Sequence, residues 1–420
     1  MYRIKDSYFL IACLFLVWAP SLSGQTSVID GEIRSRTEYR DGFRYPLTVD
    51  VKPAMISSLR TRLRFDYTDE KLATSVILQD SRIYGQTGTN DTRNSLGIYE
   101  AWGRYALTPD LSITLGRQAI EYDDKRLLTV SNWSHTGSAH DLVLVRYESH
   151  LFKLHWGGAW NNSGDDEYDK LYKVTKSYKA LSFVWFAKTF GPLNLSAIWI
   201  GDGFQQGKTD AVTWKTFRNT VGGNLELADQ GIRPFSFYAT AYYQFGRDPR
   251  NAVLDAHLLA LKTSFSPFRQ WSLRAGVDYL SGSTSAEISQ GRNGTFNKLY
   301  GSNNSFNGKM EYWTTPPVQG LFNWYAGIIF HPGRKFDADI IFHSFSVAEP
   351  FSATAKKNIG TELDLTARYI ISPQLALQGG WSLYFRNRQT ALLKEGIFSN
   401  VRFPQWGYLM VTLKPRFLNR

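Results

Sequence analysis

Links between successive strand-like segments alternate between short and long along the chain, and this alternation limits the fold more than any other feature of the sequence. Within the segments, apolar and polar side chains alternate, which is the two-residue period of a strand with two different faces. Short links include 108–110 and 190–192, whereas long links include 121–140 and 282–320. This pattern predicts an antiparallel sheet with tight turns at one edge and long loops at the other.

The length of the chain favours a closed sheet. A soluble chain of 420 residues would normally divide into roughly two or three domains, but this sequence has no linker and no break in composition. About 18 strand-like segments can be counted, an even number as single-chain bacterial barrels require. No later apolar run reaches the roughly 18 residues of a spanning helix. We predict an all-β fold: one transmembrane antiparallel β-barrel of residues 25–420, with short periplasmic turns, long extracellular loops and an aqueous channel.

Residues 1–24 resemble a secretory signal peptide. A basic start and an apolar segment at 8–19 precede small residues at 21–24, where cleavage is expected. The sequence before Cys13 also resembles a lipoprotein cleavage box, which is the alternative form of processing. Cys13 is the only cysteine, so removal of this segment excludes disulfides and cysteine–metal sites. These features predict an exported protein of the outer membrane of a Gram-negative bacterium.

The charge of the chain suggests its partners. The net charge is +11, and it becomes +10 if Arg3, Lys5 and Asp6 are removed with the amino-terminal segment. A basic exported protein is expected to meet anionic polysaccharide, the phosphates of lipopolysaccharide, or small anionic solutes. Nucleic acid is not expected as a partner in that compartment. Outer-membrane lipid would surround the barrel, and the aromatic-rich stretch 406–417 resembles a final strand read by the barrel assembly machinery.

Alternation places many arginines on the polar strand face, which lines the lumen of a barrel. A guanidinium group can bind a carboxylate through two parallel hydrogen bonds, and it keeps its charge. The pore arginines predicted in this way are Arg34, Arg36, Arg60, Arg62, Arg64, Arg104, Arg274 and Arg368. The same face carries the carboxylates Asp30, Glu32, Glu38, Asp66, Glu100, Asp278, Glu362 and Asp364. Each arginine can therefore either bind an acidic solute or stiffen the wall by pairing with a carboxylate.

The apolar face of each strand is expected to meet lipid. This expectation includes 181–187, where Leu, Phe, Trp and Ala occupy every second position. The segment 253–265 suits a helix as well as a strand, and its faces cannot be assigned from the pattern. Aromatic side chains near strand ends are expected at the membrane interfaces. The candidates for stacking on sugar rings inside the lumen are Trp102, Tyr238 and Tyr242.

No set of residues in the sequence points to catalysis or to metal binding. The seven histidines are scattered, and no pair has metal-ligand spacing on one strand face. No serine–histidine or aspartate–histidine set accompanies them. Acidic clusters at 123–124 and 165–167 lack the spacing of a calcium loop and are interpreted as solvated charge. We therefore expect no enzyme activity, no metal and no cofactor. The link 282–320 is either an extracellular flap or, because 299–313 is strongly patterned, a folded element.

Several segments, taken in order, resemble the alginate export family of outer-membrane barrels. They are GEIRSRTEYR (31–40), RTRLRFDY (60–67), LGRQAIEYDDKRL (115–127), LYGSNNSFNGKMEYW (299–313) and GTELDLTARYIISP (360–373). Each segment is weakly specific alone, but the ordered set covers nearly the whole mature chain. The resemblance implies a monomeric 18-stranded barrel with an electropositive, arginine-lined pore. The founding members of this family pass alginate, a polyuronate, outward across the outer membrane.

The resemblance also assigns individual residues. Arg117, Gln118, Asp124 and Arg126 match the family signature. This match implies pore positions for Arg117 and Arg126, with Asp124 as a carboxylate partner. The chain departs from the family at 138–141, which reads Ser-Ala-His-Asp where members commonly have an Arg-x-Phe-Asp segment.

The implied pore position of Arg117 conflicts with strict alternation. The apolar side chains of 111–115 are expected to meet lipid, and Arg117 follows on the same face. A charge near the bilayer midplane costs about 2–4 kcal/mol. We therefore expect either a bulge at or just after Gly116 or a position for Arg117 at the outer rim.

These features predict an outer-membrane channel that passes anionic solutes by diffusion through an arginine-lined pore. Repeated sites of moderate strength would let an anion move along the pore without being trapped. The first interpretation of the solute is an acidic polysaccharide such as alginate, or its oligomers. The alternative is a porin for small organic anions. A barrel enzyme and a surface adhesin are the alternatives from other functional classes.

Overall fold

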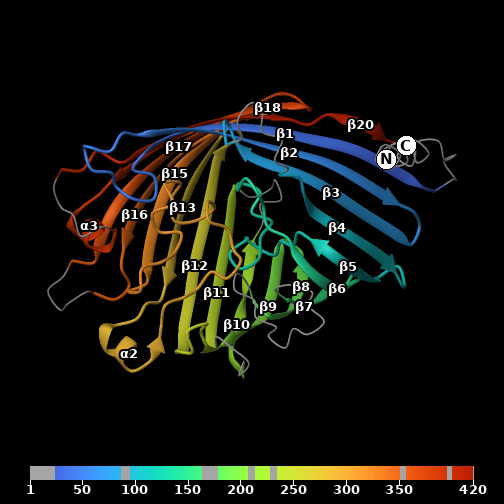
Figure 1. The fold of residues 1–420 in the computed structure, drawn as a ribbon, viewed down its shortest axis with the longest axis horizontal. Helices are drawn as coiled ribbons and strands as arrows, with labels where there is room; N and C mark the ends of the chain where they lie inside the picture. Colours follow the sequence, from blue (N-terminus) through green and yellow to red (C-terminus); the bar gives the residue numbers. More distant parts are fainter. Residues whose placement is uncertain are drawn as a thin grey trace, which may run out of the picture.

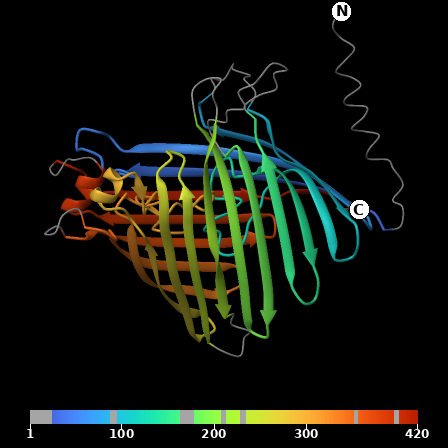
Figure 2. The ribbon, with the colours of Figure 1, turned by 90° about the horizontal axis from the view of Figure 1, so that it is seen from below.

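A computed structural model describes residues 24–86, 95–162, 178–206, 213–227, 234–350, 356–394 and 400–419. The strands of these residues form one continuous wall (Figures 1 and 2). In chain order the wall consists of β1 (Thr26–Asp41), β2 (Ala54–Thr68), β3 (Leu72–Ile83), β4 (Gly97–Ala106), β5 (Leu111–Gln118), β6 (His140–Glu148), β7 (Lys153–Trp160), β8 (Ala180–Phe190), β9 (Leu193–Gln206), β10 (Thr213–Leu227), β11 (Phe235–Arg247), β12 (Val253–Phe268), β13 (Trp271–Leu280), β15 (Leu321–Gly333), β16 (Phe336–Ser346), β17 (Asn358–Ser372), β18 (Leu375–Phe385) and β19 (Gln405–Leu413). The shorter elements are β14 (Arg292–Asn293), β20 (Arg416–Asn419), α2 (Ser285–Ser289) and α3 (Arg388–Lys394).

The first and last wall strands close the barrel. β1 pairs antiparallel with β2 along almost its whole length and with β19 over residues 33–41. β20 continues the chain after Pro415 and pairs with the start of β1. Each remaining wall strand pairs with the wall strands before and after it in the chain. The prediction of a closed antiparallel barrel of about 18 strands is therefore confirmed.

Tight turns and long loops lie at opposite ends of the barrel, as the link lengths predict. Among the described connections, 119–139 and 281–320 are the two longest that are described throughout; we call them loop A and loop B. No helix in the described ranges is long and apolar enough to cross a membrane. The predicted signal peptide, except for Gly24, and the acidic cluster 165–167 lie outside the described residues.

Strand register places the predicted polar faces toward the lumen. Arg34 lies directly opposite Arg60 across the β1–β2 pair, and both side chains are buried. Ile33, on the other face of β1, is 41% exposed and available to lipid. In β13, Asp278 is buried on the lumen side, whereas Leu273 on the opposite face is exposed. Alternation alone therefore identified the lumen face of these strands.

Several strands present apolar side chains to the lumen, among them β8 and β12. In β8, Leu181 and Phe183 are buried, and the Phe183 ring packs edge-on against Tyr122 of loop A at 5.3 Å between centroids. The expected lipid-facing orientation of 181–187 is therefore wrong. In β12, the segment whose faces the pattern left open, Leu254 and Leu258 point inward and are buried. These inward apolar side chains are stable because folded loops, and not water, cover them.

Loops A and B fold into the barrel and form a packed cluster with its wall. Leu127 and Leu128 of loop A belong to this cluster, as do Met310 and Trp313 of loop B, and all four are nearly inaccessible to solvent. The two loops also contact each other through their backbones, because the Tyr300 N–H donates to the Leu127 carbonyl at 3.0 Å. Part of the expected aqueous lumen is therefore filled by chain. Of the two alternatives for the link 282–320, an extracellular flap or a folded element, the structure shows the folded element.

Candidate functional site

Three arginines of β1 and β2 hold loop A against the wall. Arg34 and Arg60 both donate to the carbonyl oxygen of Ser134, at 2.6 and 3.1 Å. Arg36 donates to the carbonyl oxygen of Trp133 at 2.8 Å, and its guanidinium carbon lies 4.4 Å from the centre of the Trp133 ring. Because loop carbonyls occupy their donors, these three side chains are buried between wall and loop.

Carboxylates offset the positive charge of these arginines. Arg34 and Arg60 face each other as like charges, but Glu32 accepts from Arg60 Nε at 2.9 Å. Glu38 accepts from Arg36 Nε at 2.8 Å. Of the two interpretations that the sequence left open, the structure therefore shows pairing for Arg36 and Arg60. It shows loop anchoring for all three arginines.

Arg126 connects loop A to the wall and to loop B. Its Nε contacts Asp124 at 2.6 Å, and its Nη2 contacts Asp278 of β13 at 2.6 Å. Its guanidinium carbon lies 4.0 Å from the centre of the Phe306 ring in loop B. Burial lowers the pKa of Arg126, but the attraction of Asp278 and Asp124 outweighs this effect and holds the pKa above its ordinary value. The triad therefore joins both loops and one side of the barrel as a charged unit.

Carboxylates of β17 hold loop B on the opposite wall. The Met310 N–H donates to Glu362 Oε1 at 2.7 Å, and the Lys309 N–H donates to Asp364 Oδ2 at 3.1 Å. Gly308 allows this close approach: its φ is +82°, and an added Cβ would lie 2.5 Å from Glu362 Oε2. Glu362 and Asp364, predicted as partners of pore arginines, therefore bind loop backbone instead.

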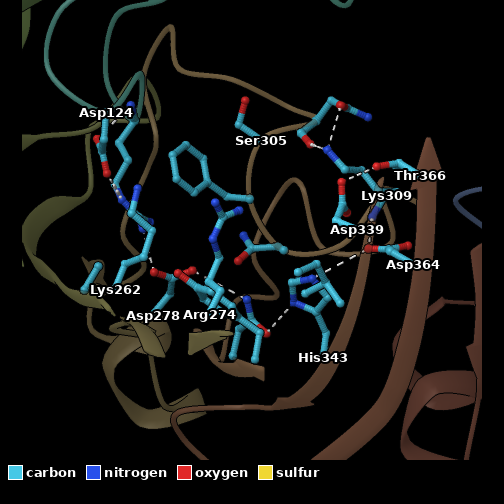
Figure 3. A pocket seen from close by; sticks show the side chains of 18 of the residues that line it. Asp124, Lys262, Arg274, Asp278, Ser305, Lys309, Asp339, His343, Asp364 and Thr366 are labelled. Atoms are coloured by element: carbon cyan, nitrogen blue, oxygen red, sulfur yellow. Dashed lines mark hydrogen bonds and ion pairs between the residues drawn. The ribbon is translucent and has the colours of Figure 1, made fainter. Parts of the chain in front are cut away.

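A cavity of about 350 Å³ lies between the two loops and the wall (Figure 3). Its lining contains equal numbers of basic and acidic side chains: Arg126, Lys262, Arg274 and Lys309, with Asp124, Asp278, Asp339 and Asp364. The cavity also has aromatic walls, formed by Trp133, Tyr238, Phe306, Tyr325 and Tyr408. Figure 3 shows Lys262, Arg274 and Asp278 on one side and Lys309, Asp339 and Asp364 on the other. A solute in this cavity would meet charges of both signs and aromatic faces.

Lys262 and Arg274 are the basic groups of this cavity that remain available to a ligand. Neither forms an ion pair with another described residue, and Arg274 Nε is buried without a hydrogen-bond partner. Lys262 opposes Gly276, and Arg274 opposes Ser264, so the two side chains are diagonal neighbours on the lumen face of β12 and β13. Two adjacent cations with free donors are suited to binding a carboxylate.

The other acids of the cavity have partners. Asp124 and Asp278 pair with Arg126, and Asp339 accepts a hydrogen bond from the Thr366 hydroxyl. Asp364 accepts a hydrogen bond from the Lys309 N–H. The formal charges of the lining therefore sum to zero, but each carboxylate has a partner in the protein, whereas Lys262 and Arg274 form no ion pair with a described residue.

A second cavity, of about 470 Å³, adjoins the first and reaches the turn 149–152 at the periplasmic end. The two cavities share three lining residues: Asp124, Tyr238 and Lys262. The Lys262 ammonium lies 5.0 Å from the centre of the Tyr238 ring. A solute moving between the cavities must therefore pass the Lys262 side chain.

The remaining predicted pore arginines lie apart from this cavity. Arg62 donates to Gln79 at 2.8 Å, and its guanidinium carbon lies 3.7 Å from the centre of the Tyr99 ring. Arg64 pairs with neighbouring Asp66 at 2.7 Å and lines a third cavity of about 430 Å³ beside the turn 373–374. Arg104 and Arg368 are exposed on the lumen side of β4 and β17, and neither forms an ion pair with a described residue. The predicted arginines thus occupy several separate parts of the barrel.

Arg117 lies on the outward face of β5, on the same side as exposed Leu115. It pairs with Asp141 of β6 at 2.9 Å near the extracellular ends of the strands, and both side chains are partly exposed. The pairings of β5 run without a register shift, although Gly116 has a φ of +114°. Of the two expected solutions, the bulge is wrong and the rim position is correct. The structure does not bring Arg117 into the lumen, which corrects its assignment as a pore residue.

The aromatic candidates differ in their surroundings. Tyr238 lines both cavities, whereas Tyr242 is buried and accepts a hydrogen bond from Asn224 at 2.8 Å. Trp102 donates to Glu100, a predicted pore carboxylate, at 3.0 Å. Tyr238 is therefore the one of these three that can contact a solute in the described cavities. The described residues contain no group of three or more side chains suited to holding a metal ion.

Sequence reasoning missed Lys262, the central cation of the site. It lies in 253–265, where inward Leu254 and Leu258 gave an apolar pattern on both faces and hid the lumen side. The register of β11, whose faces were predicted correctly, was the signal that could have found it, because Lys262 pairs opposite lumen-facing Tyr238. Arg218 was missed as well; it is buried on β10 and paired with Asp202.

His135 lies where loop A meets the arginines of β1. Its Nε2 is 3.2 Å from Arg36 Nη2. Burial and the charge of Arg36 lower the pKa of His135 to about 4, with Arg34 and Arg40 acting in the same direction and Glu38 opposing them. In an undocked loop the pKa would return to about 6.5. Protons therefore favour the undocked loop, and the docking free energy decreases as the pH falls from about 6.5 toward 4.

Acidification is expected to increase movements of loop A. In single-channel recordings, transitions between conductance levels should become more frequent as the pH falls from 6.5 to 4. A His135→Gln variant, which keeps a polar side chain but cannot take up a proton there, should show a much weaker pH dependence. Equal pH dependence in both proteins would rule out His135 as the responsible group.

The chain is similar to one protein family and to several solved structures. A family model described as "Alginate export" matches residues 27–386. No curated protein gives a match to the chain. Among solved structures, Pseudomonas aeruginosa OccK3 (OpdO) is similar with a TM-score of 0.62 and 14% identity, over 93% of this chain and 96% of that one. P. aeruginosa OccK9 (OpdG) gives 0.62 and 12%, over 93% and 98%. P. aeruginosa OpdK with vanillate gives 0.60 and 11%, over 93% and 99%. At these identities the likeness concerns the fold alone.

Proposed function

This chain belongs to the alginate export family, and from that premise we propose that it is an outer-membrane channel through which carboxylated solutes diffuse. The closed barrel, with loops folded into its lumen, is a suitable scaffold for such a channel. Passage requires no covalent chemistry and no cofactor. The driving force is the concentration gradient of the solute, and selectivity comes from the charges along its path.

The observation that carries this proposal is the pair Lys262 and Arg274. Both point into a cavity beside loops A and B, and neither is neutralised by a described carboxylate. A carboxylate of the solute can accept hydrogen bonds from both groups. The shared position of Lys262 between two adjoining cavities supports transfer of the bound anion toward the periplasmic side.

The size of the cavities supports small organic anions as the solute. Volumes of about 350 and 470 Å³ fall in the range of sites for small molecules. Tyr238 and Tyr325 can stack on a sugar ring or an aromatic ring. One structurally similar protein, OpdK, has been crystallised with vanillate, a small aromatic carboxylate.

An acidic polysaccharide is the second candidate, and family membership favours it. The exposed lumen arginines Arg64, Arg104 and Arg368 offer further positive charge outside the central cavity. A polymer would have to pass the contacts between loop A and loop B, so its passage requires these loops to move. Small anions require a smaller displacement.

A length series of oligouronates separates the two candidates. In planar bilayers, galacturonate and its dimer are expected to interrupt the current through the channel and to permeate. Chains of more than about five sugars should block without crossing, because folded loops occupy the lumen. Permeation of long polyuronates at a rate similar to the monomer would favour polymer transport. Lack of interaction with any uronate, together with cation selectivity, would contradict an anion channel.

The other features inferred from the sequence complete this proposal. We expect removal of residues 1–24 on export, insertion by the barrel assembly machinery and a monomeric channel surrounded by lipid and lipopolysaccharide. Mass spectrometry of the mature amino terminus tests the first of these expectations directly.

A further inference from the structure

A fourth cavity lies between loop B and the extracellular ends of β11 and β12, and it is separate from the central cavity. Its volume is about 580 Å³, and its walls are the two limbs of loop B and the turn 248–252 between β11 and β12. Its lining shares no residue with the central cavity. We call this chamber the vestibule.

The vestibule carries an excess of positive charge. Its basic lining residues are Arg218, Arg250, Arg292 and Lys298, whereas Asp248 is its acidic residue. Arg218 is neutralised by Asp202, so the excess comes from Arg250, Arg292 and Lys298. Asp248 is already engaged, because it accepts from the Arg250 and Ala252 N–H groups and from the Asn293 amide, each at 2.9 Å. This excess contrasts with the balanced charges of the central cavity.

Two of these cations are available at the opening. The side chain of Arg250 is 84% exposed, and its contact with Asp248 is long, at 3.8 Å. The side chain of Arg292 is 52% exposed and lies 3.6 Å from Asp255, which is itself exposed. Exposed ion pairs of this kind contribute little, so an incoming anion can replace them at low cost.

The inner surface of the vestibule is apolar. Leu254 and Phe296 form its buried base, and Ile288 and Val318 line it while remaining about half exposed. Ile288 and Val318 lie on different limbs of loop B, and both line this one chamber. A chamber with an apolar base and a basic opening matches a ligand with an apolar body and an anionic group.

Lys298 lies at the boundary between vestibule and central cavity. Its ammonium group contacts the Asn303 side chain and lies 3.5 Å from the Ser302 carbonyl oxygen, just before the residues that line the central cavity. Burial lowers the pKa of Lys298 to about 8, with Glu311 opposing this effect and Arg44 adding to it. Lys298 therefore remains mostly charged at neutral pH.

We propose that the vestibule is a distinct binding site for amphipathic organic anions, such as aromatic carboxylates, and that it captures them from the extracellular side. This inference rests on the proposed function and adds to it a solute class and a direction of loading. Of the two cavities at the periplasmic end, the one that reaches the turn 149–152 is lined by equal numbers of lysines and carboxylates. The one beside the turn 373–374 has an excess of basic residues, but Ile77 is its one large apolar side chain. Capture should therefore be asymmetric between the two sides of the membrane.

The test uses single channels of the whole protein in planar bilayers, with 2-naphthoate as the amphipathic probe and galacturonate as a hydrophilic anion of the same charge. Addition of 2-naphthoate on the extracellular side should give a blocking rate on the order of ten-fold higher than addition on the periplasmic side. Galacturonate should show a much smaller difference between the sides. The Arg250→Gln/Arg292→Gln variant should lose most of the extracellular advantage of 2-naphthoate.

Two further variants separate apolar from electrostatic capture. Val318→Ser should reduce the 2-naphthoate block from the extracellular side and leave galacturonate unchanged. Arg247→Gln is the matched control: Arg247 lies at the same end of β11 and is exposed, but it does not line the vestibule. Its guanidinium donates to the carbonyl oxygen of Asn251 in the turn at 2.8 Å, and the glutamine amide keeps a donor for this contact. It removes a nearby positive charge and should leave both probes unaffected.

The outcomes distinguish this inference from the proposed function. Equal block by 2-naphthoate from both sides, with normal galacturonate block, would overturn the vestibule site and leave the anion channel intact. Failure of both anions to interact with the channel from either side would overturn the proposed function itself. An effect of Arg247→Gln equal to that of the double variant would show general electrostatic attraction and not a site.

Discussion

Replacement of both Lys262 and Arg274 by glutamine is expected to turn the channel from anion to cation selectivity. These two residues are half of the basic groups that line the central cavity, while its four aspartates would remain. Hydrogen bonds to charged groups contribute about 1.5–3 kcal/mol each. Loss of both should therefore weaken the binding of a uronate by at least about ten-fold.

The substitution should not disturb the barrel. Neither side chain pairs with a described carboxylate, so their removal leaves no buried acid without a partner. The reversal potential in a salt gradient measures the selectivity, and the concentration dependence of galacturonate block measures the affinity. The charge-conserving variant Lys262→Arg/Arg274→Lys should keep anion selectivity. Retention of full anion selectivity in the glutamine variant would place the selective site elsewhere.

Replacement of Arg126 by methionine is expected to release the two loops from each other. The guanidinium group is 7% exposed and contacts Asp124 of loop A and Asp278 of the wall, each at 2.6 Å. Methionine would leave both carboxylates close together without a counter-charge. Removal of one partner from a buried ion pair typically costs about 3–5 kcal/mol. That cost corresponds to a shift of roughly a hundred- to several thousand-fold in the docking equilibrium of the loop.

The expected result is a larger and noisier conductance, with faster cleavage of 119–139 by proteinase K in reconstituted protein. The wall strands should still assemble, because their ladder of hydrogen bonds does not include this side chain. Arg117→Met is the matched control, since it removes an arginine from a partly exposed pair with Asp141. Such exposed pairs contribute about 0–1 kcal/mol. Unchanged conductance and protease resistance in the Arg126 variant would show that the loops stay docked without the triad.

The arginines of β1 and β2 show where pattern reasoning succeeds and where it stops. Alternation placed Arg34, Arg36 and Arg60 on the lumen face, because a strand has only two faces and lipid excludes charge from one of them. Their partners did not follow from alternation. The carbonyl oxygens that they bind belong to residues about a hundred positions away in the chain, as in the contact between Arg34 and Ser134.

Lys262 illustrates the opposite case. Its strand presents apolar side chains to the lumen near Leu254 and Leu258, so the rule that apolar faces meet lipid could not identify its lumen side. The same rule assigned 181–187 to lipid, although loop A covers Phe183 from inside. An apolar face of a barrel strand is stable wherever water is excluded from it, either by lipid or by a folded loop.

The barrel itself followed from local properties of the chain. The sequence has a two-residue period, alternating link lengths and no long apolar run. Together these features predict a closed antiparallel sheet, because every backbone N–H and C=O group within a membrane must form a hydrogen bond inside the protein, and a closed sheet has no unpaired edge strand. The central site depended on tertiary structure, since loops A and B select which lumen charges they neutralise. They occupy Arg34, Arg36, Arg60 and Glu362, and they leave Lys262 and Arg274 available to a solute.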